Sequence, residues 1–244
     1  MGSTLPHIVT RKQTQIAERE AAILDIATEI ICREGPDALT MERVLARVDF
    51  SKGTLYNHFT CREDLLVAVH AQCFALHFDY FARGALFRGR ARERFSAAGL
   101  GHQILHRLDP RPFRFSLNDT ILAAASERWR DMFVHYNRES IGVFTGIVRD
   151  AIAAGDLPAG TDPEVVTLGT WSTACGAEDL YESKLIMRHL SAPDFDRVRN
   201  QLIAALLDGF GWQPLSSVHD YDATRQRALG EVFGDEARKL GLIS

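Results

Sequence analysis

The sequence predicts an all-α protein, with a three-helix helix-turn-helix unit at the N-terminus and a larger helical domain after it. Apolar residues recur at three- and four-residue steps along almost the whole chain, and no sustained two-residue alternation of the kind a strand shows is present. Near the N-terminus, two neighbouring helical segments span only about two turns each, and helices that short do not persist without packing. These segments must therefore fold as one cooperative unit with the helix before them.

The composition is that of an ordinary soluble protein. The 244 residues are 46% hydrophobic and 25% charged, with no uninterrupted apolar run of about 18 residues and no secretory signal pattern. We therefore expect a cytoplasmic protein without a membrane partner. The net charge of −4 gives no indication of a polyanionic partner, so a nucleic-acid site would depend on where individual charges lie. The cysteines show no C-x-x-C spacing and are expected to be reduced thiols.

The N-terminal unit should begin with one long helix. After a flexible arm, residues 1–14, an apolar stripe runs from about Gln15 to Glu34. Gly35-Pro36 then provides a helix stop.

Two short helices should follow. Thr40 is a suitable N-cap for the second helix, and Ser51 for a third helix that reaches about His58. Asp49-Phe50 makes the tight connection between them, which gives the helix-turn-helix arrangement. We assign residues 15–62 to this domain.

A capping box opens the next, longer helix. Thr60 and Glu63 have the S/T-x-x-E spacing in front of a long apolar pattern. This helix, at about 61–83, connects the N-terminal domain to the rest of the chain, and its residues 63–83 belong to a second domain that we place at 63–212.

The second domain also reads as a series of helices. Gly155 to Pro158 ends one of them, and Asp162-Pro163-Glu164 starts another as N-cap, first-turn proline and first-turn acid. The expected helices lie at about 91–107, from about 118, at 127–154, 163–179 and 194–211. Residues 213–244 hold one or two weaker amphipathic pieces, a helical extension to which the sequence assigns no role.

The third short helix is the candidate DNA-reading element, because a helix-turn-helix places its second short helix in the major groove. Gly53 inside this helix costs about 1 kcal/mol relative to alanine, which is explained if the backbone must approach DNA closely. Tyr56 and His58 can donate to phosphate oxygens, and free amides beside Thr40 and Arg62 can bind anions. The candidate DNA-binding residues are Thr40, Arg43, Ser51, Lys52, Gly53, Thr54, Tyr56, Asn57, His58 and Arg62. Each residue taken alone is more often simply part of a packed short helix.

The combination resembles a known family. The stretch "ILDIATEIICREGPDALTMERVLARVDFSKGTLYNHFTCREDLLVAV" is similar to the DNA-binding domain of the TetR family of bacterial transcriptional regulators. The family pattern is matched here by Ala27, Gly35, Thr40, Ser51 to Tyr56, His58, Phe59, Arg62, Glu63, Leu65 and Leu66.

Two positions depart from the family pattern. Val48-Asp49-Phe50 stands where the family has A-G-V, and we expect the turn to survive because Asp tolerates the left-handed conformation. Arg62 replaces the usual Lys and keeps its charge.

The resemblance implies a homodimer that binds a palindromic operator in double-stranded DNA, more typical of a repressor than an activator. It also implies that the second domain dimerises and encloses a small-molecule effector, which we expect to be largely apolar or aromatic. The candidate effector-binding residues are Phe78, Phe133, Tyr136, Asn137, Trp171 and Glu178. The candidate dimer residues are Trp171, Val198, Leu202, Leu206 and Phe210.

Other chemistry has little support. His102 and His106 have a spacing that can hold a metal, with Asp109 nearby, but no further ligand is indicated. Neither G-x-S-x-G nor a Walker phosphate loop is present. We therefore expect no catalytic residue, no metal and no cofactor.

Two alternatives stay open. One is an all-helical small-molecule-binding or catalytic protein that keeps the fold without sequence-specific DNA binding. The other is a regulator whose pocket is collapsed and which responds to a protein partner.

Overall fold

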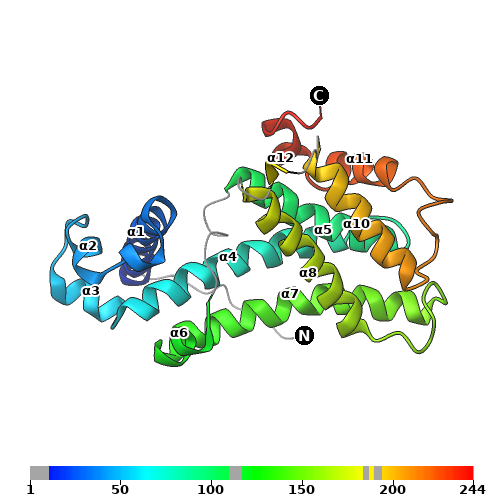
Figure 1. The fold of residues 1–244 in the computed structure, drawn as a ribbon. Helices are drawn as coiled ribbons and strands as arrows, with labels where there is room; N and C mark the ends of the chain where they lie inside the picture. Colours follow the sequence, from blue (N-terminus) through cyan, green and yellow to red (C-terminus); the bar gives the residue numbers. More distant parts are fainter. Residues whose placement is uncertain (1–10, 110–116, 184–186, 190–193, 244) are drawn as a thin grey trace. The chain divides into compact units, whose positions relative to one another are not determined.

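The computed structural model describes residues 11–109, 117–183, 187–189 and 194–243, and every long regular element within them is a helix (Figure 1). No strand occurs in these residues, which confirms the all-α prediction. The elements are α1 (Arg11–Glu34), the 3-10 helix η1 (Pro36–Ala38), α2 (Met41–Leu45), α3 (Lys52–His58), α4 (Arg62–Ala85), α5 (Ala91–Leu108), α6 (Asp119–Ala124), α7 (Glu127–Ala153), α8 (Pro163–Glu182), α10 (Phe195–Gly209), α11 (Tyr221–Glu231) and α12 (Gly234–Lys239).

The chain forms two compact units. Unit 1 comprises Met1–Ala75 with Asp109–Tyr136, and unit 2 comprises Leu76–Leu108 with Asn137–Ser244. Helices α4 and α7 thus contribute to both units. The expected division at residues 62 and 63 differs from this one, because the first half of α4, all of α6 and the start of α7 complete the core of the N-terminal unit.

The core of unit 1 is an apolar cluster shared by α1, α3, α4 and α7. Ile23, Leu55 and Leu65 have no exposed surface. The ring of Trp129 stacks on Phe59, with centroids 4.8 Å apart and planes 8° from parallel. Aromatic pairs of this kind contribute beyond the area they bury, so α7 is an integral part of the small N-terminal fold.

Unit 2 packs its helices in two pairs that can be followed in Figure 1. Helix α8 lies beside α10, and α11 lies against α5. The C-terminal extension therefore folds onto the unit, with Phe233 completely buried. The fully buried Trp212 contacts Phe95 edge-on, with ring centroids 5.0 Å apart.

Arg92 on α5 is a buried charge inside unit 2. Its side chain is 1% exposed and donates to the carbonyls of Trp212, Pro214 and Ala204 at 2.5, 2.9 and 3.2 Å. Asp208 lies 2.6 Å from the same guanidinium. Because a buried charge is tolerated only when it is paired and hydrogen-bonded, this network fixes the end of α10 against α5.

Helix α4 is apolar and long enough to cross a membrane by length and composition. Its first half instead supplies core residues, since Leu65, Leu66 and Ala68 are completely buried in unit 1. A single helix of this kind is typical of a core helix, and it gives no support for a membrane span.

Two local predictions need correction. Helix α1 begins at Arg11, so residues 11–14 are helical and only residues 1–10 of the expected arm remain, outside the described residues. Asp49 does not adopt the left-handed conformation, because no described residue other than glycine has a positive φ. By contrast, Gly35 has a φ of 90° and ends α1 as expected.

Candidate nucleic-acid interface and effector cavity

The two short helices begin at the caps that the sequence predicts. The Thr40 hydroxyl accepts the Arg43 backbone N–H at 3.2 Å, and the Ser51 hydroxyl accepts the Thr54 N–H at 3.2 Å. Each cap satisfies one of the free amides of a helix start. Thr54 also lies within hydrogen-bonding distance of Ser51 through its hydroxyl, at 3.1 Å.

Helix α3 presents a polar outer face. Ser51, Lys52, Gly53 and Asn57 are exposed, whereas Leu55 is completely buried on the opposite side. The small, polar face carries the residue types that contact base edges and phosphates.

Three details of this face bear on DNA binding. The Lys52 Nζ lies 5.4 Å from the centre of the half-buried Tyr56 ring, so these two candidates form one cation–π pair. A Cβ added to Gly53 would meet only the Ser51 Oγ, at 3.8 Å. No contact among the described residues of unit 1 therefore requires a glycine at position 53.

His58 points into the domain rather than outward. Its side chain is 9% exposed, and its Nδ1 lies 3.1 Å from the Glu20 carboxylate on α1. Arg128 of α7 donates two further hydrogen bonds to Glu20, at 2.7 and 2.8 Å. Burial alone would raise the pKa of Glu20, but the bonds from Arg128 and His58 outweigh it and lower this pKa. The geometry gives His58 a role in holding α3 on α1, which differs from the phosphate contact expected for it.

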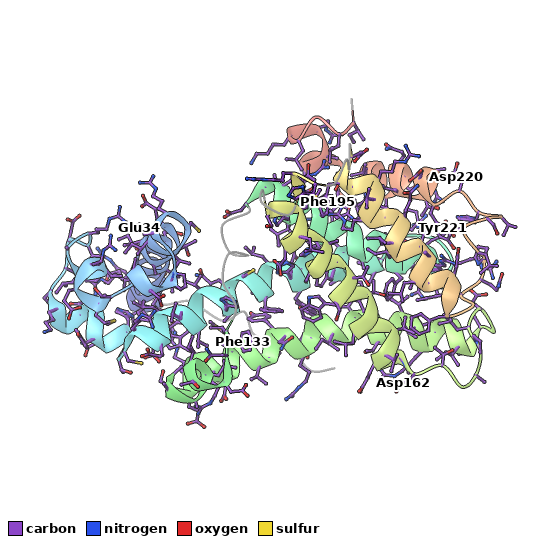
Figure 2. The ribbon with its side chains drawn as sticks, in the orientation of Figure 1. Glu34, Phe133, Asp162, Phe195, Asp220 and Tyr221 are labelled. Carbon is purple, nitrogen blue, oxygen red and sulfur yellow. The ribbon has the colours of Figure 1, made fainter. Side chains whose placement is uncertain are left out.

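Arg43 and Arg62 are also engaged within the domain. Arg62 donates from Nε to the Leu39 carbonyl at 2.9 Å and from Nη2 to the Pro36 carbonyl at 2.8 Å. Arg43 bonds the Ala38 carbonyl at 3.0 Å and pairs with Glu34, which is labelled at the end of α1 in Figure 2. These contacts fix the segment between α1 and α2, so both arginines position the interface.

The predicted capping box at Thr60 uses a different acid. Asp64, rather than Glu63, accepts the Thr60 backbone N–H at 2.7 Å and the Thr60 hydroxyl at 2.8 Å. The reason is that α4 begins at Arg62, one residue later than the box assumed. Sequence reasoning missed Asp64, although its spacing from Thr60 was visible.

The family comparison decides what this domain is. Residues 23–69 match the family model for bacterial regulatory proteins of the tetR family. The helix-turn-helix domain is a TetR-family domain. This match covers the helix-turn-helix and the start of α4, the same stretch on which the sequence resemblance depends.

Solved structures share the fold over most of the chain. A tetR-family regulatory protein from Rhodococcus RHA1 is 20% identical and has a TM-score of 0.61, covering 79% of this chain and 96% of its own. FadR from Bacillus subtilis, solved in complex with stearoyl-CoA, is 17% identical with a TM-score of 0.59, covering 82% of this chain and 100% of its own. TylP, a TetR regulator from Streptomyces fradiae, is 21% identical with a TM-score of 0.60, covering 93% of this chain and 94% of its own. No curated protein matches the sequence.

Unit 2 contains a cavity of about 1360 Å³. Its walls come from α4, α5, α7, α8, α10 and α11, and all of its lining residues belong to unit 2. Its apolar and aromatic lining includes Phe81, Phe95, Phe144, Trp171, Leu207, Tyr221 and Leu229. The start of α11 at Asp220 and Tyr221, labelled in Figure 2, is part of this lining, so the C-terminal extension helps to form the cavity.

The predicted effector residues are distributed unevenly. Trp171 lines the cavity, and Glu178 is bonded to two lining residues, His102 at 2.9 Å and Arg199 at 3.2 Å. Phe133, labelled in Figure 2, lies in the core of unit 1, where its ring meets Phe74 edge-on at 5.4 Å.

The remaining effector candidates do not line the cavity. Tyr136 belongs to unit 1 and packs on the neighbouring His135, with ring centroids 5.0 Å apart. Phe78 is half-buried on α4, and the Asn137 Oδ1 is buried without a hydrogen-bond partner among the described residues. Aromatic spacing on one helix could not reveal that these side chains face different surroundings.

The predicted dimer residues lie on the paired helices α8 and α10. Leu202 is 47% exposed and Trp171 36% exposed, whereas Val198, Leu206 and Phe210 are half-buried. The sequence analysis missed Leu168 and Val165 on α8, which are exposed by 66% and 52%. Together these side chains leave apolar surface on the outside of the pair.

His102 and His106 have a spacing that can hold a metal, although no metal was expected there. In the described residues no group of histidine, cysteine and acidic side chains is arranged to hold a metal ion. His102 instead forms a chain of contacts, with its Nδ1 3.0 Å from the His77 Nε2 and its Nε2 2.9 Å from Glu178.

Proposed function

We propose that this TetR-family regulator is a homodimeric repressor that binds a palindromic DNA operator through α3. In this proposal a small, largely apolar or aromatic effector enters the cavity of unit 2 and lowers the operator affinity. The observation that carries the DNA-binding part is the exposed polar face of α3, where Gly53 is free of contacts that would explain it. The protein would act in the cytoplasm, where the bacterial chromosome lies.

The effector part is supported by the cavity in unit 2. Its volume of about 1360 Å³ exceeds the range of roughly 300 to 1,000 Å³ that is usual for small-molecule sites, so a sizeable ligand can be accommodated. The fold is shared with a regulator solved with stearoyl-CoA and with SmeT, the repressor of a multidrug efflux pump. The stearoyl-CoA complex favours a ligand with a large apolar body.

The dimer part is supported by α8 and α10. Val165, Leu168 and Leu202 expose apolar surface on these adjacent helices. A second copy packed on the same face would bury this surface around a two-fold axis, which a palindromic operator requires.

The proposal is tested by operator selection from random duplex DNA with the purified protein. The expected result is enrichment of a palindrome, with binding that weakens steeply as salt rises. Lys52→Ala should weaken binding about tenfold and reduce the salt slope by about 1, because one phosphate contact is lost. Tyr56→Phe should also weaken it, while Lys239→Ala on α12 serves as the charge-matched control.

Two outcomes would contradict the proposal. If no palindrome is enriched, with or without ligand, the chain is a small-molecule-binding or catalytic protein that keeps the fold. If a palindrome is enriched but Lys52→Ala and Tyr56→Phe bind it as the wild type does at matched salt, α3 is not the reading helix.

A further inference from the structure

Arg225 on α11 is a cation in the cavity of unit 2 that forms no ion pair with any acid in the part of the chain that the structure describes. It lines the cavity and donates from Nη1 to the side-chain oxygen of Gln103 on α5. Among the described residues, no carboxylate lies within ion-pair distance of its guanidinium. This differs from Arg92, whose buried charge is paired with Asp208 and bonded to three carbonyls.

Two more arginines line the same part of the cavity. Arg199 is 3% exposed and bonds Glu178 at 3.2 Å and Asp196 at 2.6 Å, and Arg107 shares Asp196 with it. Arg199 and Arg107 are thus ion-paired with carboxylates, whereas Arg225 has no carboxylate within ion-pair distance among the described residues. The Arg199 Nε has no hydrogen-bond partner among the described residues, although it is buried.

Other acidic groups near the cluster are exposed to solvent. Asp194 caps α10 by accepting the Arg197 N–H at 3.1 Å, and Asp222 lies in the first turn of α11. Both side chains are exposed and line the cavity, and their charges raise the pKa of Arg225 less than burial, Arg199 and Arg107 lower it.

The electrostatics of Arg225 agree with this geometry. Burial lowers the pKa of Arg225, and the charges of Arg199 and Arg107 lower it further, to about 10. An anion placed against such a group would relieve both effects. Two amide side chains, Gln103 and Asn200, line the cavity and can serve as neutral donors. They are linked by a hydrogen bond of 3.2 Å from the Gln103 Nε2 to the Asn200 Oδ1.

We propose that the effector of this regulator is an amphipathic monoanion, a carboxylate that Arg225 anchors while its apolar body packs among Phe81, Phe95 and Trp171. The inference rests on the proposed effector site and names its ligand class. A planar guanidinium binds a carboxylate through two parallel hydrogen bonds, and a carboxylate would give Arg225 the ion-pair partner that it lacks among the described residues. The C-terminal extension, which carries Arg225, is then part of the sensor.

The test is a fluorescence titration of the full-length protein without DNA. The probes are 11-(dansylamino)undecanoic acid and its methyl ester, which differ in the negative charge and share the apolar body. The wild type should bind the acid about ten to one hundred times more tightly than the ester, as expected for a hydrogen bond to a charged group. Arg225→Met should remove most of this preference, whereas Arg238→Met on the exposed part of α12 should keep it.

Three outcomes would overturn the inference. These are equal binding of acid and ester by the wild type, an unchanged preference in a correctly folded Arg225→Met, and tighter binding of dodecyl phosphate than of dodecanoate. Circular dichroism checks the fold of each variant, and Arg225→Lys should retain part of the preference because it keeps the charge.

Operator binding separates this inference from the proposed function. In the absence of ligand, Arg225→Met should bind the selected operator as tightly as the wild type does, because the substitution lies in unit 2. If the protein prefers the acid to the ester but no operator is selected, the ligand class is supported and the proposed regulatory function is wrong. If an operator is selected but acid and ester bind equally, the regulatory function is supported and the ligand class is wrong.

Discussion

Asp64 joins the start of α4 to the start of α7, because its carboxylate accepts the Ser126 backbone N–H at 2.7 Å. The other carboxylate oxygen accepts both hydrogen bonds from Thr60. The side chain has no exposed surface. One carboxylate therefore closes unit 1 between segments 62 residues apart in the sequence.

Asp64→Asn should destabilise the protein by about 2–3 kcal/mol, because the amide keeps the shape but loses the charge and half of the acceptor capacity. Chemical denaturation measures the free energy of unfolding, and Asp131→Asn on the exposed face of α7 is the control. An equal loss in both variants would show that Asp64 has no special role.

The wild type and Asp64→Asn should also differ in how their free energy of unfolding depends on pH. Burial alone would raise the pKa of Asp64, but the hydrogen bonds from Ser126 and Thr60 outweigh it and hold this pKa below the ordinary value of 3.8. Because the folded-state pKa is lowered, the stabilisation is complete above the unfolded value and is lost as the pH falls through the folded value. The difference between wild type and Asp64→Asn should therefore narrow below about pH 3.8.

Gly53→Ala should stabilise the fold and weaken DNA binding at the same time. The added Cβ meets only the Ser51 Oγ at 3.8 Å, so helix propensity should raise the free energy of unfolding by about 0.5–1 kcal/mol. If the backbone of α3 approaches DNA, operator affinity should fall about tenfold, as when one specific contact of about 1–3 kcal/mol is lost. Gly142→Ala in α7, whose Cβ would contact nothing, should stabilise without this loss.

His58→Ala should lower stability more than operator affinity. The substitution removes a partly buried hydrogen bond to Glu20, worth about 1 kcal/mol. Thermal melting measures the first effect, and operator titration of the fully folded protein measures the second. The neighbouring Asn57→Ala, at an exposed position on α3, should show the reverse pattern. A His58→Ala protein that loses operator affinity without loss of stability would restore the phosphate contact predicted from the sequence.

If the protein forms the proposed dimer through α8 and α10, Leu168→Glu should convert it to a folded monomer. Leu168 is 66% exposed on α8, and a charge in the centre of an apolar interface would be desolvated without a partner. Sedimentation equilibrium measures the mass. Leu86→Glu, at a position that is 81% exposed beyond α4, should leave the mass unchanged. A dimeric Leu168→Glu would place the interface on another face.

The sequence predicted those features that depend on neighbouring residues. Caps at Thr40, Ser51 and Asp162 and the stop at Gly35 are local hydrogen-bonding and backbone preferences, and all four are confirmed. Helix α3 ends at His58 as expected.

Features that depend on distant residues were missed. His58 contacts Glu20 across 38 residues, and Arg225 donates to Gln103 across 122 residues. Phe133 has the same helical spacing as a cavity residue, yet it packs in unit 1. Periodicity shows which face of a helix is buried and does not show against which partner, so the candidate site was predicted better in α3 than in unit 2.

The sharing of α7 between the two units limits how these regulators can be recombined. The ring of Trp129 on α7 stacks on Phe59, and the Ser126 backbone N–H just before α7 donates to Asp64. Trp129 and Ser126 both lie far along the chain from α3. A chimaera that takes only its first 75 residues from another protein would pack that protein's equivalent of Phe59 against the Trp129 of this one. Exchanging the N-terminal domain of this protein as a folded unit therefore requires residues 117–136 together with the first 75, which two separate segments of the gene encode.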